Sequence, residues 1–366
     1  MKWKQQIHNM KAYQPGKPIE AVKEMYGLKE VVKLASNENP FGCSPKVNAY
    51  LQRADVNHAI YPDGYAQSLR TVMAEHLQVS EKELIFGNGS DDLIAMITRS
   101  LLYPGVNTVM ADPSFSQYAH NADIEGAEVC KVPTVNGAHD LTAMLAAIDE
   151  NTSVVWVCSP NNPTGVVIAD DELQNFLRQV PQDVLVVLDE AYYEYVVDER
   201  HKDTLPLIHT YPNVIILRTF SKAYGLAGFR VGYGIANEEI IAKIDPVRAP
   251  FNNTVLSHEI AKIAIKDQAF IEACIEANES GKRQFEAFCN KHGLHYYPSA
   301  TNFVLFEVKA DSDVVFEKLM QRGFIVRSGN ALGVPGYLRV TIGTKEQNEA
   351  FFKQLEEVLQ EQGVLV

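Results

Sequence analysis

The chain has 366 residues, 46% of them hydrophobic and 22% charged, which is ordinary for a globular protein with a sizeable core. The formal net charge of −13 disfavours nucleic-acid binding, because no basic block is available to neutralise phosphates. The chain contains no long apolar run, and its first ten residues contain no apolar stretch. We therefore expect neither a membrane span nor a signal peptide. Five scattered cysteines without CxxC spacing are typical of reduced thiols in a cytoplasmic protein.

The N-terminal segment is predicted to be an arm, not part of a core. Residues 1–30 are polar and contain prolines. A short apolar run at 31–35 ends in a loop of turn-forming residues at 36–42. A helical stretch is predicted at 44–53, and apolar positions recur at helical spacing from residue 67 onward.

Seven short β-branched or apolar runs then alternate with helical stretches. The runs lie at 84–86, 108–111, 128–132, 153–158, 184–188, 214–217 and 231–235. Helical stretches separate most of them, at 91–102, 116–124, 141–148 and 171–180. This alternation predicts an α/β fold whose mostly parallel seven-stranded sheet has helices on both faces. In such sheets the ligand site lies at the carboxyl ends of the strands.

The pattern changes after about residue 249. A helical run from 255 to about 292 leads to predicted strands and helices at 302–306, 312–322, 337–342 and 345–361. This mixture predicts a smaller α+β domain at the C-terminus. We expect residues 44–249 to form a large domain and residues 250–366 to form a small domain. Residues 1–43 are expected to form an arm that packs with the small domain.

Lys222 stands at the end of a predicted buried strand, surrounded by small residues and followed by Arg230. Most lysines lie on the surface, and that is the simpler explanation. The alternative is an amine held in a pocket to form a Schiff base, with Ser221 and Arg230 binding a nearby phosphate. Lys222 alone does not decide between the two, so the other loops at the strand ends must be considered.

The segment 87–92, Gly-Asn-Gly-Ser-Asp-Asp, joins a predicted strand to a predicted helix. Its glycines allow backbone amides to approach a ligand, and the start of a helix favours an anion. A plain turn with Ser90 as the helix N-cap is the alternative. The segment is not GxGxxG, and no GxxxxGK[ST] motif occurs in the chain, so the dinucleotide and P-loop fingerprints are absent.

Two further loops follow predicted strands. The loop 159–165 is rich in Asn and Pro, so it can hold one asparagine amide toward the strand ends or simply make a tight connection. Asp189 directly follows the apolar run 184–188, where a carboxylate is costly unless it is paired. Its partner could be a structural cation or the protonated ring nitrogen of a cofactor.

Together these motifs resemble, over essentially the whole chain, the fold-type-I pyridoxal-phosphate aminotransferases. The resemblance implies pyridoxal 5′-phosphate as cofactor. It implies that Lys222 forms the Schiff base and shuttles a proton, and that Asp189 keeps the pyridine nitrogen protonated. It also implies that Tyr192 bonds the ring hydroxyl, as a third catalytic residue.

The same resemblance implies a set of further cofactor contacts. Asn162 would bond the ring hydroxyl together with Tyr192, and Phe115 would stack on the ring. Relatives can have tyrosine in place of Phe115, so only its stacking role carries over. The phosphate would be held by Gly89, Ser90, Asp91, Ser221, Arg230 and, across a homodimer interface, by Tyr61.

Three segments, 34–42, 61–64 and 338–343, are similar to those of the histidinol-phosphate aminotransferase group. The reaction implied is transamination of L-histidinol phosphate with 2-oxoglutarate, giving imidazole-acetol phosphate and glutamate in histidine biosynthesis. The substrate-side residues implied by the resemblance are Tyr13, Asn37, Arg327 and Arg339.

Other functions are open on the sequence alone. A threonine-phosphate decarboxylase shares the asparagine-rich opening loop, and an aromatic amino acid aminotransferase could bind a carboxylate at an arginine site built for phosphate. A regulator that carries a pyridoxal-phosphate domain would need an additional DNA-binding domain, for which the arm has no room. A metal site at His292 and His295 is disfavoured, because no Cys or carboxylate cluster adjoins them.

Overall fold

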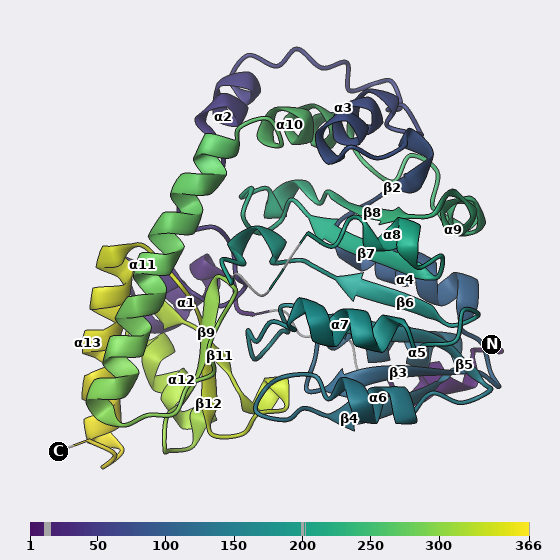
Figure 1. Cartoon of the computed structure of the whole chain (residues 1–366). Coiled ribbons are helices and arrows are strands. Elements are labelled where there is room, and N and C mark those ends of the chain that lie inside the picture. Colours follow the sequence, from purple (N-terminus) through teal and green to yellow (C-terminus); the bar gives the residue numbers. More distant parts are fainter. Residues whose placement is uncertain (11–15, 199–200, 202, 366) are drawn as a thin grey trace.

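The computed structural model describes residues 1–10, 16–198, 201 and 203–365. Its centre is a seven-stranded sheet with strand order β2-β8-β7-β6-β5-β3-β4 (Figure 1). The strands are β2 (Leu84–Gly87), β3 (Asn107–Asp112), β4 (Glu128–Pro133), β5 (Thr152–Cys158), β6 (Leu185–Asp189), β7 (Val214–Thr219) and β8 (Gly232–Ala236). β8 runs antiparallel to β2 and β7, while the other pairs are parallel. The prediction of a mostly parallel seven-stranded sheet is therefore confirmed.

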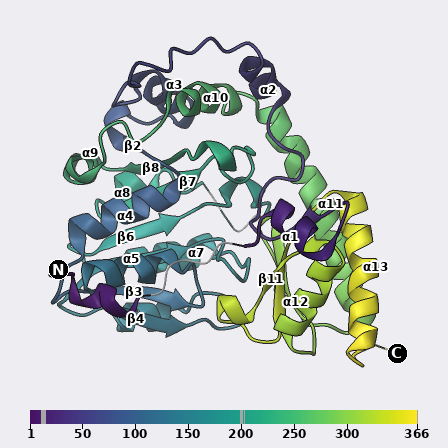
Figure 2. The same ribbon diagram turned by 180° about the vertical axis from the view of Figure 1, so that it is seen from behind.

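Helices cover both faces of this sheet, as the two opposite views show (Figures 1 and 2). One face is covered by α4 (Ser90–Leu101), α5 (Gln117–Glu125) and α9 (Glu238–Ile244). The other is covered by α3 (Gln67–Leu77), α6 (Leu141–Ala146), α7 (Asp170–Leu177), α8 (Leu207–Thr210) and α10 (Val255–Ala264). Within the described ranges, no helix is both long and apolar enough to span a bilayer.

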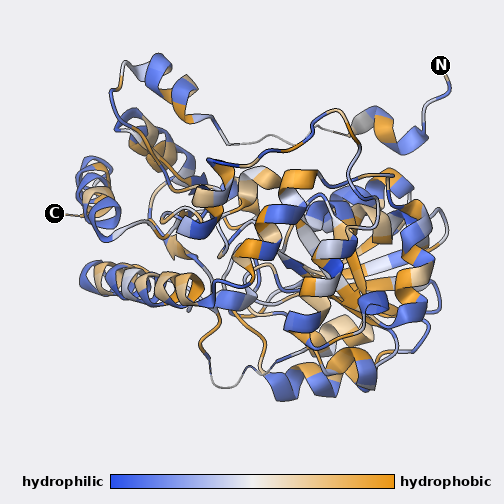
Figure 3. Cartoon of the chain, turned by 90° about the horizontal axis from the view of Figure 1, so that it is seen from above, coloured by the Kyte–Doolittle hydropathy of each residue, from blue (hydrophilic) through white to orange (hydrophobic). Residues whose placement is uncertain are grey.

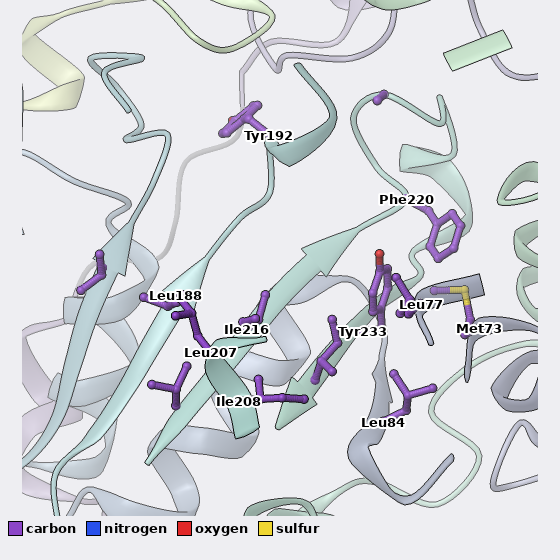
Figure 4. Packing of buried hydrophobic residues seen from close by; sticks show 14 of the residues in the cluster. Met73, Leu77, Leu84, Leu188, Tyr192, Leu207, Ile208, Ile216, Phe220 and Tyr233 are labelled. Atoms are coloured by element: carbon purple, nitrogen blue, oxygen red, sulfur yellow. The ribbon is translucent and has the colours of Figure 1, made fainter. Parts of the chain in front are cut away.

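The strands are apolar on both faces because successive side chains point to opposite sides of the sheet. In β6, Val186 and Leu188 join the core with α3 and α7, while Leu185 and Val187 join the core with α4 and α5. Figure 4 shows the first of these cores, where side chains from β6, β7 and β8 meet those of α3 and α8. Seen from above, the hydrophobic strands are enclosed by helices whose hydrophilic residues lie at the periphery (Figure 3).

The C-terminal part forms a second layer around a three-stranded antiparallel sheet of order β11-β12-β9. Its elements are β9 (Phe303–Glu307), β11 (Arg327–Ser328), β12 (Tyr337–Thr341), α11 (Gln268–His292), α12 (Ser312–Gln321) and α13 (Lys345–Glu361). A separate parallel pair joins β1 (Val32–Lys33) to β10 (Phe324–Ile325). The N-terminal segment thus lies against the C-terminal elements, whereas α10 contacts α3 and α2 (Pro45–Leu51). The exact division into arm, large domain and small domain stays a prediction.

Two sequence-based expectations are wrong. The helical run 255–292 is not continuous, because the chain turns between α10 and α11 at Asp267. The Asp267 carboxylate accepts hydrogen bonds from Ser44 and from Lys46 Nζ (2.6 Å), and these contacts come from a segment far away in sequence. The expectation that the N-terminal segment has no part in a core is also wrong. This segment contains a helix, α1 (Ile19–Tyr26), which buries Val22 in a cluster with Ile325 and contacts α12.

Candidate active site

Lys222 follows β7 at the carboxyl edge of the central sheet. Its Nζ donates a hydrogen bond to the carbonyl oxygen of Ser36 (3.1 Å) and lies 5.8 Å from the centre of the Tyr192 ring. Burial, assisted by the positive charge of Arg339, lowers the pKa of the Lys222 ammonium to about 8. The amine therefore loses its proton far more easily than a surface lysine does, as a nucleophilic or proton-transferring lysine must.

Asp189 is the last residue of β6, and only 3% of it is exposed. Alternation along the strand places it on the same side as Leu185 and Val187. Its carboxylate accepts hydrogen bonds from the Tyr118 hydroxyl (2.5 Å) and from the backbone N–H of Ala191 (3.2 Å). Burial raises the pKa of the Asp189 carboxyl to about 6, although both donors favour the charged form.

A structural ion pair is present beside Asp189, but Asp189 is not its member. The neighbouring Glu190 accepts a hydrogen bond from Arg218 Nε at 2.9 Å, and both side chains are buried. The Arg218 guanidinium also lies 3.5 Å above the centre of the Tyr193 ring. Arg218 thus pairs with Glu190, whereas the hydrogen bonds of Asp189 come from Tyr118 and Ala191.

The segment 87–92 forms a narrow turn into α4. Gly89 has φ +80°, and a Cβ at this position would lie 2.6 Å from Arg230 Nη2. A Cβ at Gly232 of β8 would lie 2.7 Å from the backbone nitrogen of Ser90. Gly232 therefore needs glycine because a side chain would meet the backbone, and Gly89 needs it because of its positive φ. Gly89 is the N-cap residue and Ser90 the first helical residue, so the alternative reading of Ser90 as the N-cap is wrong.

Arg230 joins this turn to the loop after β7. Its Nη1 donates to Ser221 Oγ (3.4 Å), and its Nη2 lies 3.5 Å from Asp91 Oδ2. A guanidinium, a hydroxyl and the start of a twelve-residue helix thus meet at one place. This is a suitable set of donors for a phosphate group.

A network of polar side chains joins the central sheet to the C-terminal sheet. Asn37 Nδ2 donates to the Tyr192 hydroxyl (2.9 Å), and Thr341 Oγ1 donates to Asn37 Oδ1 (3.0 Å). Arg339 Nη1 donates to Asn162 Oδ1 at 2.5 Å, and its Nη2 donates to the carbonyl of Ala35 at 2.7 Å. Four of the residues predicted for cofactor or substrate, Asn37, Asn162, Tyr192 and Arg339, are therefore held in contact with partners in this network.

Three further predicted residues, Phe115, Arg327 and Tyr61, have contacts outside the hydrogen bonds described above. Phe115 is half-buried, with its ring edge-on to that of Tyr118 (5.6 Å between centroids). Arg327 faces Arg339 as its cross-strand partner between β11 and β12. Tyr61 is 78% exposed and stacks on Phe251 at 4.7 Å. Tyr13 lies outside the described residues.

Sequence reasoning missed Tyr118, Thr341 and the carbonyl groups of Ala35 and Ser36. Tyr118 comes shortly after the strand predicted at 108–111, and this position near a strand end was its only signal. Two histidines considered for a metal have other contacts, since His292 bonds Glu356 and His295 bonds Tyr337. Across the part of the chain that the structure describes, no cluster of three or more His, Cys, Asp or Glu side chains is arranged to bind a metal.

Known proteins resemble this chain over most of its length. The profile of the family described as aminotransferase class I and II matches residues 29–355. A histidinol-phosphate aminotransferase of Lysinibacillus sphaericus is 70% identical over 364 residues, which cover 100% of both chains. The crystal structure of histidinol-phosphate aminotransferase from Sinorhizobium meliloti in complex with pyridoxal-5′-phosphate has a TM-score of 0.89 and 26% identity, covering 98% of both chains.

A more distant likeness shows the fold alone. The L-threonine-O-3-phosphate decarboxylase from Porphyromonas gingivalis has a TM-score of 0.79 and 24% identity, covering 90% of this chain and 100% of that one. The fold is thus shared by enzymes that break different bonds. The family profile and the full-length relative are more specific, and by them the chain belongs to the class I and II aminotransferase family.

Proposed function

We propose that this chain is a histidinol-phosphate aminotransferase. It exchanges an amino group between L-histidinol phosphate and 2-oxoglutarate, giving imidazole-acetol phosphate and glutamate in histidine biosynthesis. The observation that carries the proposal is the 70% identity, over the full length, to a protein with this name. Threonine-phosphate decarboxylation is disfavoured because that likeness is limited to the fold, and an aromatic amino acid substrate has no comparable support.

The experiment that tests this proposal compares two substrates at fixed 2-oxoglutarate. We expect histidinol phosphate to be turned over with a much higher kcat/KM than unphosphorylated histidinol. The reason is that its phosphate is an anion that arginine side chains can bind, whereas histidinol has a neutral hydroxyl at this position. Phenylalanine and threonine phosphate serve as the competing substrates. Preferential turnover of phenylalanine, or release of carbon dioxide from threonine phosphate, would replace the proposed reaction.

Pyridoxal phosphate is the proposed cofactor, and the residues present fit it. The turn at Gly89 and Gly232 leaves no room for side chains, and Ser221 and Arg230 supply phosphate donors beside it. Asp189 is a buried anion with no cationic partner among its hydrogen bonds, as a protonated ring nitrogen requires. Tyr192 and Asn162 would bond the ring hydroxyl, and Phe115 would cover one ring face. When bound, the cofactor supplies the electron sink for charge developing at the substrate Cα.

The protein's own residues would prepare the proton transfer. Lys222 Nζ can accept the Cα proton at mildly alkaline pH, because its pKa is lowered to about 8. The Ser36 carbonyl orients this amine, and Tyr192 limits its movement on one side. Arg339 is fixed by Asn162 and Ala35, so it is preorganised before substrate binds. Asn37 and Tyr13 complete the proposed substrate side.

Arg339→Gln tests the substrate side. We expect kcat/KM for histidinol phosphate to fall roughly 10–100-fold, from the loss of one charge-assisted contact worth ~1.5–3 kcal/mol. Turnover of unphosphorylated histidinol should hardly change. Arg327→Gln should lower the same kcat/KM in the same direction, because Arg327 is the cross-strand neighbour of Arg339 and is also predicted to bind substrate. An equal loss on both substrates would mean that Arg339 acts by holding Asn162 and not by binding the substrate phosphate.

We further propose a homodimer in which Tyr61 reaches the phosphate of the neighbouring subunit. The support is its 78% exposure on an apolar surface shared with Ile60, Tyr65 and Phe251, all of them also exposed. Large aromatic side chains gathered on one surface are typical of an interface. A cytoplasmic location is proposed as well, since all five cysteines are free thiols.

Mixing two defective proteins tests the dimer. Lys222→Ala and Tyr61→Ala subunits should complement each other, because each hybrid dimer has one site with both residues intact. With random exchange we expect about one quarter of wild-type activity, since half of the dimers are hybrids with one intact site. Tyr103→Ala removes another exposed tyrosine and should stay active without mixing. No recovery after verified subunit exchange would place Tyr61 outside the neighbour's site.

A further inference from the structure

We propose that Tyr118 is a positioning residue for Asp189, whose buried hydroxyl fixes one carboxylate oxygen and keeps the carboxylate charged at neutral pH. This inference rests on the proposed cofactor role of Asp189. Tyr118 comes from the first turn of α5, and its hydroxyl lies 2.5 Å from Asp189 Oδ2. The contact joins residues 71 positions apart in the chain.

The ring of Tyr118 cannot turn away from this contact. Its side chain is fully buried, and it stacks on the Trp156 ring with 4.6 Å between centroids and 10° between planes. Trp156 is held in turn, because its Nε1 donates to Thr108 Oγ1 (2.8 Å). The hydroxyl is therefore aimed at Asp189 by packed neighbours on β3 and β5, as preorganised catalytic groups require.

The two oxygens of the Asp189 carboxylate accept hydrogen bonds from different partners. Oδ2 accepts from Tyr118, and Oδ1 accepts from the backbone of Ala191 at a longer distance of 3.2 Å. Oδ1 retains a lone pair for a ring nitrogen, since a carboxylate oxygen can accept two hydrogen bonds. Tyr118 also packs its ring against the edge of Phe115, so one side chain positions both the anion and the proposed stacking ring.

The charge on Asp189 depends on this donor. Burial raises the pKa of the Asp189 carboxyl to about 6, and the Tyr118 hydroxyl is the strongest influence that opposes the rise. The other titratable groups around Asp189 are Asp91 of α4, Cys158 of β5, and Glu190 and Tyr192 of its own segment. None of these is a cation, so the hydroxyl and the Ala191 amide are the groups that stabilise the anion before a cofactor binds.

Tyr118→Phe removes only the hydroxyl. We expect the pKa of the Asp189 carboxyl in the cofactor-free protein to rise by about one unit or more, into the neutral range. Infrared pH-difference spectra would measure this pKa, with the same spectra of Tyr118→Phe/Asp189→Asn subtracted. If only the charged carboxylate supports cofactor binding, the dissociation constant for pyridoxal phosphate at pH 7 should rise about 2-fold for a one-unit rise of this pKa and about 10-fold for a two-unit rise. It should recover toward the wild-type value at pH 9, where the carboxyl is charged again.

Two controls separate positioning from folding. Tyr233→Phe removes another fully buried tyrosine hydroxyl, two strands away from β6, and should leave both measurements unchanged. In the Asp189→Asn background, Tyr118→Phe should have no further effect on the pH dependence of cofactor binding. An equal effect of Tyr118→Phe in both backgrounds, or an unchanged carboxyl pKa, would overturn the inference. Wild-type activity of Asp189→Asn alone would instead overturn the proposed role of Asp189.

Discussion

Lys222→Ala should abolish transamination almost completely while the protein still binds pyridoxal phosphate through its phosphate donors. The Lys222 amine can both bond covalently to the cofactor and accept a proton. Its covalent role makes the effect larger than that of any single hydrogen bond. The measurement is kcat with histidinol phosphate, together with cofactor binding followed by absorbance.

Covalent labelling identifies the lysine directly. Borohydride treatment of the yellow wild-type protein should attach the cofactor to the peptide that contains Lys222, and Lys222→Ala should not be labelled there. Lys243→Ala is the matched variant, because Lys243 is exposed on α9 and should have no role. A label on Lys243, or on any other lysine, would contradict the assignment of Lys222.

The rate of this covalent attachment should depend on pH. The pKa of Lys222 is lowered to about 8, so the neutral, nucleophilic amine becomes the major form only above that pH. Attachment to the cofactor-free protein should therefore speed up as the pH rises through 8 and level off above it. An ordinary lysine would continue to accelerate toward its usual pKa of about 10.4.

The central sheet could be predicted because most of its strands are buried on both faces, the edge strand β4 being the exception. Such strands are continuous apolar runs, and all seven predicted runs correspond to observed strands. The order of the strands and the reversed direction of β8 have no local signal, since they depend on which strands pair across the sheet. The break at Asp267 was missed for a similar reason, because the helical pattern continues through it and Ser44 supplies the contact that stops it.

In the candidate site, too, residues at the ends of predicted strands could be predicted, whereas their partners from other elements could not. Gly89, Asn162, Asp189 and Lys222 stand at the ends of predicted strands, so the rule for parallel sheets brings them to one edge. Their partners do not follow from that rule. Tyr118 has the pattern of an ordinary core residue in a helix, and its hydroxyl meets Asp189 only because α5 packs on the face to which β6 directs that side chain.

Asp189→Asn should lower kcat by at least ~10²-fold, which is comparable to the loss of one preorganised electrostatic contact. The amide has nearly the same shape but carries no charge, so it cannot hold a proton on the ring nitrogen. Cofactor affinity should fall much less, because the donors at Ser221, Arg230 and the start of α4 remain. Asp112→Asn is the matched variant, since Asp112 ends β3 at the same edge of the sheet but is exposed.

Although Asp189→Asn should lower turnover, it should raise the stability of the cofactor-free protein at pH 8. The pKa of Asp189 is about 6 in the folded chain against 3.8 for an ordinary aspartate, so the folded state binds more protons between about pH 4 and pH 6. The free energy of unfolding therefore falls as the pH rises through this window, and the cost of the buried anion is fully present above pH 6. Asp189→Asn removes the cost, so its cofactor-free Tm should be higher than that of the wild type at pH 8 and similar near pH 4. A lower Tm at pH 8 combined with wild-type turnover would make Asp189 a structural residue. A higher Tm combined with lost turnover is expected of a charge that is kept for chemistry at the expense of stability.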